Sequence, residues 1–133
     1  MLNFPIFWID DPKREAIAEA ITEVLREQKY TCYACAICGN HLHLVIRTHE
    51  HDAETMWNFF ADGVRGRLRL RFAAEVSPNH PVISARPYKV FLYTPQQVRE
   101  RIKYVEDNPP KENLARQQWD FVVAYDNWPF YTR

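Results

Sequence analysis

The chain has 133 residues, of which 47% are hydrophobic and 14% aromatic, so it can bury one hydrophobic core as a single domain over residues 1–133. Its 17 basic and 17 acidic side chains cancel, and the net charge favours no class of partner. No apolar run approaches the roughly 18–20 residues that cross a bilayer, and no signal-peptide pattern opens the chain. We therefore expect a cytoplasmic protein without a membrane partner, and the odd number of cysteines suits a reducing compartment.

An opening strand and a helix are predicted at the start of the chain. Residues 3–9 are apolar and aromatic, which is typical of a short strand. Asp10 or Asp11 then caps a helix that has Pro12 at its first position. Apolar residues at helical spacing continue this helix to near Lys29.

A hairpin and a second helix follow. Residues 30–37 and 41–47 predict two antiparallel strands, joined by a turn at residues 39–40. From about Asp52 towards Glu75, large apolar side chains recur every four residues, which predicts a second helix.

A last strand and a third helix precede an aromatic tail that is expected to pack onto the body. Residues 88–93 predict a fourth strand, and Thr94 and Pro95 begin a helix that ends at Pro109-Pro110. The element order predicts an α+β fold, the ferredoxin-like split βαβ, with a four- to five-stranded antiparallel sheet and helices on one face. The third helix is then an extra, C-terminal element.

Two histidines on the predicted third strand form a candidate metal site. His41 and His43 are two positions apart, so their side chains point to the same face, while Leu42 and Leu44 point to the core. Imidazole nitrogens bind transition metals, and two of them leave coordination positions open for a substrate. The alternative interpretation is that both are incidental polar residues on a half-exposed strand.

Tyr104 is a candidate nucleophile on the predicted third helix, outside the apolar stripe of that helix. Asn108 follows one turn later on the same face and offers a carbonyl oxygen to a metal. A phenol has an unperturbed pKa near ~10, so it needs a nearby cation to attack as the phenolate. Arg101 or Lys103 could supply that charge. The alternative is a surface tyrosine that shields an apolar edge.

The cysteines offer a rival metal site. Cys32, Cys35 and Cys38 precede His41 at intervals of three, as in some zinc or iron–sulfur sets. On a regular strand, however, Cys32 and Cys38 point to one face and Cys35 to the other. We therefore expect buried thiols rather than a cluster. His49 and His51, just beyond the strand, are either outer groups of the histidine site or idle loop residues.

Basic side chains are concentrated in residues 65–103, which carry nine basic and two acidic residues. Such a segment can attract a polyanion, although a solvated helix face explains it equally well. The predicted nucleic-acid contacts are Arg65, Arg67, Arg69, Arg71, Arg101 and Lys103.

Two motifs resemble those of a known family, the single-tyrosine HUH transposases, and especially the REP-associated tyrosine transposases. They are Gly-Asn-His41-Leu-His43-Leu-Val-Ile and, some sixty residues later, Tyr104-Val-Glu-Asp-Asn108-Pro-Pro-Lys111. The resemblance covers residues 22–126. It implies that His41 and His43 hold Mg²⁺ or Mn²⁺ with Asn108 as a third ligand, and that Tyr104 attacks a phosphate in DNA.

The implied function is a metal-dependent endonuclease and strand transferase. It acts on single-stranded or hairpin DNA and leaves a 5′-phosphotyrosyl link and a free 3′-hydroxyl. The family also includes homodimers that exchange the tyrosine helix. The alternative is a domesticated or inactive relative that binds single-stranded nucleic acid, with bases stacked on aromatic side chains of an open sheet such as Phe7, Tyr33 and Phe91.

Overall fold

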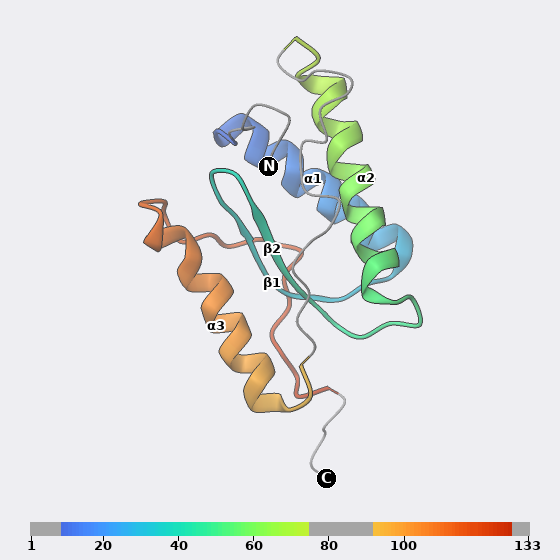
Figure 1. The fold of residues 1–133 in the computed structure, drawn as a ribbon, viewed down its shortest axis with the longest axis vertical. Helices are drawn as coiled ribbons and strands as arrows, with labels where there is room; N and C mark the ends of the chain where they lie inside the picture. The colour runs from blue at the N-terminus through green and yellow to red at the C-terminus, as the bar shows by residue number, and fades with distance from the viewer. Residues whose placement is uncertain (1–8, 75–91, 129–133) are drawn as a thin grey trace, which may run out of the picture.

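A β-hairpin lies at the centre of the computed structural model, which describes residues 9–74 and 92–128 (Figure 1). The elements in chain order are α1 (Asp11–Gln28), β1 (Cys32–Ile37), β2 (Leu42–Ile46), α2 (Ala53–Arg71) and α3 (Pro95–Lys111). Helices α1 and α2 pack together on one side of the hairpin, and α3 lies on the other side (Figure 1). Within the described residues, none of the helices is long and apolar enough to cross a membrane.

The sheet is smaller than predicted. In the described part of the chain it consists of β1 and β2 alone, so the expectation of a four- to five-stranded ferredoxin-like sheet is wrong, and the fold is a small α+β arrangement. The further strands expected over residues 3–9 and 88–93 lie mostly outside the described residues, and the few described ones are not in a strand. The larger sheet was inferred from short apolar runs, and such a run does not by itself specify that a segment pairs as a strand.

The edge of β1 that faces away from β2 is paired by the C-terminal segment. The side-chain amide of Gln117 accepts a hydrogen bond from the Ile37 N–H and donates one to the Ile37 carbonyl, both at 2.8 Å. Farther along, the Val123 N–H donates to the Cys32 carbonyl at 3.0 Å, and Val122 forms an isolated bridge with Cys32. These bonds satisfy edge groups that a third strand would otherwise pair.

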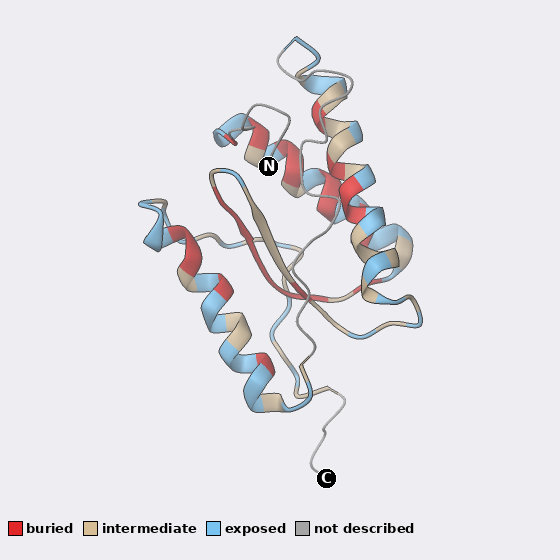
Figure 2. Cartoon of the chain, in the orientation of Figure 1, coloured by how far each residue is buried: buried red, intermediate tan, exposed pale blue. Residues whose placement is uncertain are grey.

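Hydrophobic cores lie on both faces of the hairpin, and β1 is buried along its whole length (Figure 2). The larger core lies between the hairpin and the α1–α2 pair. Its buried members include Ile17, Ile21, Ile37, Phe60 and Leu68. The smaller core lies between the hairpin and α3. Its buried members include Ala34, Ala36, Val45, Val98 and Val105. The described part of the aromatic tail packs against both cores, as predicted.

Helices α1 and α2 begin and end close to the predicted residues. Asp10 caps α1 by accepting a hydrogen bond from the Lys13 N–H at 3.1 Å, and Lys29 ends it in the left-handed region with a φ of 57°. Helix α2 is continuous through Gly63, where a Cβ atom would lie 3.0 Å from Val24 Cγ2 of α1. The missing side chain therefore lets the two helices approach closely.

Charged side chains extend the contact between α1 and α2 beyond the core. Arg67 donates to Glu19 at 2.7 Å and also to Glu23, and Arg71 forms a second ion pair with Glu19. The Arg67 guanidinium lowers the pKa of the Glu23 carboxyl through a hydrogen bond and its charge.

We expect Arg67→Gln to lower the melting temperature at neutral pH, because Glu23 loses its hydrogen-bonded cation and Glu19 keeps only Arg71. A depressed carboxyl pKa stabilises the fold fully above the ordinary value, 4.5 for glutamate, and this stabilisation is lost as the pH falls through the folded-state pKa. The difference from the wild type should therefore shrink between about pH 7 and about pH 3.5 in circular dichroism melts. An equal difference at both pH values would contradict this account.

Helix α3 ends one residue beyond the predicted proline pair. It continues through Pro109 and Pro110 and ends at Lys111. A proline has no N–H group, so the carbonyl four residues before it loses its helical partner. For Pro110 that carbonyl belongs to Glu106, and Arg116 Nη1 donates to it at 3.3 Å instead. The extension brings the end of α3 to the turn of the hairpin (Figure 1).

Candidate metal and tyrosine site

His41 and His43 share one face of the hairpin, as predicted. Their ring centroids are 4.7 Å apart, with the rings nearly perpendicular. Leu42 and Leu44 pack into the larger core on the opposite face. Val45, two residues after His43, is buried against α3, so the histidine face is the one that α3 covers.

Tyr104 projects from α3 towards this histidine face. Its ring centroid lies 6.0 Å from that of His43 in an edge-on contact, and 44% of the residue is exposed. Two cations lie over the tyrosine ring, since Arg101 Cζ is 5.0 Å and Lys111 Nζ 5.3 Å from its centroid. The structure therefore brings together the phenol, an imidazole and two positive charges in a solvent-accessible place.

Asn108 is a buried polar residue of α3. It is 8% exposed, and its Nδ2 donates to the Tyr104 carbonyl at 3.2 Å. This bond points the amide back along α3 and fixes the turn that carries Tyr104. The bond uses Nδ2 and leaves the side-chain oxygen available, so the role of Asn108 as a metal ligand stays a prediction.

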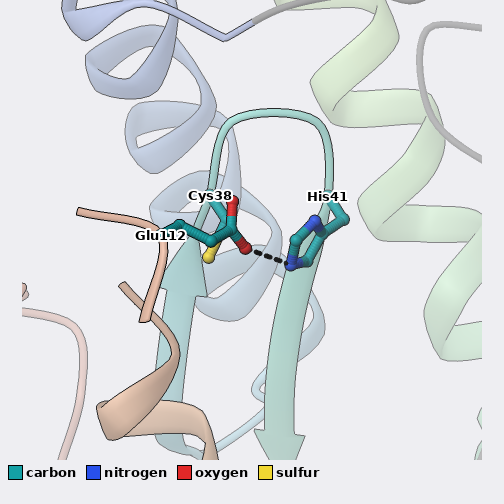
Figure 3. A group of neighbouring side chains, drawn as sticks. All are labelled: Cys38, His41 and Glu112. Carbon is teal, nitrogen blue, oxygen red and sulfur yellow. Dashed lines mark ion pairs between the residues drawn. The ribbon is translucent and has the colours of Figure 1, made fainter. Parts of the chain in front are cut away.

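Glu112 and Cys38 join the site, although sequence reasoning assigned neither to it. Glu112, the C-cap of α3, places Oε2 3.0 Å from His41 Nε2. The Cys38 sulfur lies beside the same carboxylate, and one ligand atom from each of the three residues lies within 4.8 Å of the others (Figure 3). A two-residue turn makes positions 38 and 41 cross-strand neighbours, and this signal in the sequence could have identified Cys38. Glu112 had no such signal, because its position depends on the extension of α3 through two prolines.

Burial and charge set the protonation of the site. Burial lowers the pKa of His43, and the neighbouring His41 and Arg101 lower it further, whereas Glu112 opposes the shift. His43 is therefore a neutral imidazole at neutral pH, with a nitrogen lone pair available. Burial and the Glu112 carboxylate raise the pKa of the Cys38 thiol to about 11, so without a bound cation this residue stays a thiol.

The other two cysteines lie on the opposite face of the hairpin. Cys32 and Cys35 belong to the larger core, whereas Cys38 belongs to the smaller one, so the three thiols do not converge. The expectation that Cys32 shares a face with Cys38 is wrong. A bulge between Cys32 and Ala34 inserts one residue and reverses the alternation of side chains.

The predicted DNA-binding residues fall into two groups. Arg101 and Lys103 are on α3, with Arg101 beside Tyr104 and Lys103 exposed. Arg65, Arg67, Arg69 and Arg71 are on α2, across the hairpin from the tyrosine (Figure 1). Arg67 and Arg71 are engaged with carboxylates of α1, and Arg65 lies 3.8 Å from Asp62. The contact between the helices therefore accounts for part of the basic segment.

His49 and His51 form a separate group near the start of α2. The Tyr30 hydroxyl lies 2.6 Å from His51 Nδ1, and the His51 N–H donates to His49 Nδ1 at 3.1 Å. Both histidine rings contact the Tyr30 ring edge-on. The two histidines therefore have structural contacts with Tyr30.

Of the aromatic residues expected to stack bases, Tyr33 is buried under Tyr125 and donates a hydrogen bond to Asp126, so it offers no free face. Phe7 and Phe91 lie outside the described residues.

Comparisons with known proteins supply no family for this chain. No protein-family model matches it, and neither the curated proteins nor the solved structures include a match.

Proposed function

We propose that this chain is a metal-dependent nuclease and strand transferase for single-stranded DNA, with Tyr104 as its nucleophile. The observation that carries the proposal is the contact between the exposed Tyr104 ring and His43, on the face that also holds His41. The two sequence motifs that resemble those of the HUH transposases support it as well.

The proposed reaction is a transesterification at phosphorus. The phenol of Tyr104 loses its proton, and its oxygen forms a bond to the phosphorus atom of a DNA phosphodiester. The bond from phosphorus to the 3′-oxygen breaks, and that oxygen takes up a proton to become a free 3′-hydroxyl. The phosphate stays on the 5′ end as a tyrosine ester, so a 3′-hydroxyl from another strand can reverse the step and complete strand transfer.

Local cations favour this chemistry at Tyr104. Arg101 and Lys111 lie close to the ring, where their charge stabilises both the phenolate and an approaching phosphate. Lys103, which is exposed on the same helix, adds charge along the path of a DNA backbone. Neutral His43 can accept the phenol proton or bind a metal, but not both at one nitrogen.

The residues around His41 are suited to a divalent cation. A bound ion would polarise the phosphate as a Lewis acid and orient it. The candidate donor atoms are His41 Nε2, a Glu112 carboxylate oxygen and a His43 nitrogen, with Cys38 adjacent and the Asn108 side-chain oxygen as the ligand predicted from the sequence. Magnesium prefers all-oxygen ligands, so manganese or a later transition metal suits this set better than magnesium does.

The proposal is tested by trapping the covalent intermediate. The purified chain is incubated with an end-labelled single-stranded DNA hairpin and Mn²⁺, and denaturing gels are used to detect a protein–DNA adduct. After protease and nuclease digestion, mass spectrometry is expected to find a nucleotide on the peptide that contains Tyr104. A modified residue elsewhere would contradict the proposal. Tight binding of the hairpin with no adduct under any divalent metal would instead support a non-catalytic nucleic-acid-binding module.

A further inference from the structure

Three side chains at the turn of the hairpin form a compact set of potential metal ligands beside the histidine pair. Cys38 directly follows β1, His41 directly precedes β2, and Glu112 directly follows α3 (Figure 3). From this juxtaposition we propose that Cys38, His41 and Glu112 bind a thiophilic divalent ion, Zn²⁺ or Co²⁺, in a site with one open position.

The backbone holds two of the ligands in a fixed relation. The Cys38 N–H donates to the His41 carbonyl at 2.9 Å, which closes the turn, and the next pair along the strands is Ile37 and Leu42. Cys38 and His41 are therefore direct cross-strand neighbours on the face that α3 covers. Side chains on a closed hairpin turn lose little entropy when they bind an ion.

His41 is already oriented as a ligand. Its Nδ1 lies 2.7 Å from Asn40 Oδ1, while its Nε2 faces Glu112. Metal-binding histidines typically donate the N–H of one ring nitrogen to an oxygen, which fixes the ring and leaves the other nitrogen for the metal. Asn40 fills that supporting position here.

The spacing of the three donor atoms suits a tetrahedral ion after a small adjustment. They lie within 4.8 Å of one another, and the nitrogen–oxygen distance is 3.0 Å. Around tetrahedral zinc, bond lengths near 2.0 to 2.3 Å hold neighbouring ligand atoms about 3.3 to 3.6 Å apart. Glu112 follows the end of a helix and has a flexible side chain, so its torsions can supply shifts of this size.

The ligand types select the metal. Thiolate and imidazole ligands favour Zn²⁺ and Co²⁺ over Mg²⁺, and a set of three protein ligands is typical of catalytic rather than structural zinc sites. On binding, the Cys38 thiol releases its proton to solvent, and His41 binds through an unprotonated Nε2. The thiolate and the Glu112 carboxylate then balance the two charges of the ion. His41 and Glu112 are partly exposed, which leaves room for an exchangeable fourth ligand.

A role for this ion in DNA cleavage rests on the proposed function, whereas the binding site itself does not. In that role the open position would receive a phosphate oxygen. His43, whose ring contacts both His41 and Tyr104, would then be free to act on the phenol. In this arrangement Cys38, His41 and Glu112 bind the metal, and His43 accepts the proton.

Cobalt spectroscopy tests the ligand set without reference to activity. Co²⁺ is titrated into the metal-free full chain while absorption is recorded. We expect a thiolate-to-cobalt charge-transfer band in the near ultraviolet that saturates at one equivalent, is removed by Zn²⁺ and is unaffected by Mg²⁺. Cys38→Ala should abolish the band. Glu112→Gln, at a solvent-exposed helix end, should weaken cobalt binding at least about tenfold.

The matched control is the double variant Cys32→Ala/Cys35→Ala, which leaves Cys38 as the sole cysteine. Both replaced thiols are buried on the other face, so the cobalt band should persist. A folded wild type without the band, or a band that survives Cys38→Ala, would overturn the proposed ligand set. A Tyr104 adduct formed with Mn²⁺ by a protein that lacks the band would overturn this site alone. A cobalt band without any adduct would support the site and count against the proposed nuclease.

Discussion

Tyr104→Phe is expected to abolish the covalent DNA adduct completely, because the phenolic oxygen is the atom that forms the bond to phosphorus. The substitution keeps the ring, so the contacts with His43, Arg101 and Lys111 remain. Tyr104 is 44% exposed, and we therefore expect its stability and its affinity for the DNA hairpin to stay within roughly twofold of wild type. Denaturing gels measure the adduct, and fluorescence anisotropy measures binding.

Tyr93→Phe is the matched control for this experiment. Tyr93 is 70% exposed and lies just before α3, about three helical turns from Tyr104. Its hydroxyl should be dispensable, and the adduct should form at the wild-type rate. An adduct that persists in Tyr104→Phe and disappears in Tyr93→Phe would show that Tyr93, and not Tyr104, is the nucleophile.

Phe60→Ala is expected to have the largest effect on stability. Phe60 is 1% exposed in the core between α1, α2 and the hairpin, and its ring lies 5.8 Å from that of Tyr30. Removing a fully buried phenylalanine costs about 3–5 kcal/mol, from lost burial and from the cavity left behind. Small domains have a free energy of unfolding of only about 5–15 kcal/mol. Urea denaturation followed by circular dichroism measures the loss.

The neighbouring Phe59 provides the control, since it has the same side chain in a different environment. Phe59 is 38% exposed and stacks on His51 at the surface. Phe59→Ala should lower the free energy of unfolding by less than about 1 kcal/mol. Equal losses for the two variants would show that the α1–α2 core does not dominate stability. If Phe60→Ala fails to fold, Phe60→Leu should give an intermediate loss that can be measured.

Local patterns predicted the helices well. The sequence predicted helix caps at Asp10 or Asp11 and at Thr94, and in the structure Asp10 and Thr94 accept hydrogen bonds from the first turn. Such capping signals need no distant partner. The apolar stripe of α3 was also correct, since Val98 and Val105 are buried. Helix α3 was predicted to end at its two prolines, and it ends one residue beyond them. The prolines remove backbone hydrogen bonds only in the last turns of the helix. Arg116 replaces one of these bonds by donating to the Glu106 carbonyl.

The size of the sheet could not be read from local patterns. Whether an apolar run pairs as a strand depends on which segment reaches the neighbouring edge. At β1 that segment is irregular chain, with Gln117 and Val123 making the bonds. The bulge that turns Cys32 to the larger core is likewise a property of pairing with β2. Neither leaves a signal in the periodicity of one strand.

The three helices, the hairpin and the common face of His41 and His43 were all predictable from local sequence patterns. These features follow from the repeat of side chains along one element and from residues a few positions apart. The sequence alone did not show that Tyr104 contacts His43, or that Glu112 reaches His41 with Cys38 beside it. The contacts of Tyr104 and Glu112 with the histidines depend on how α3 docks on the hairpin, and docking is set by long-range packing that no single stretch of chain encodes.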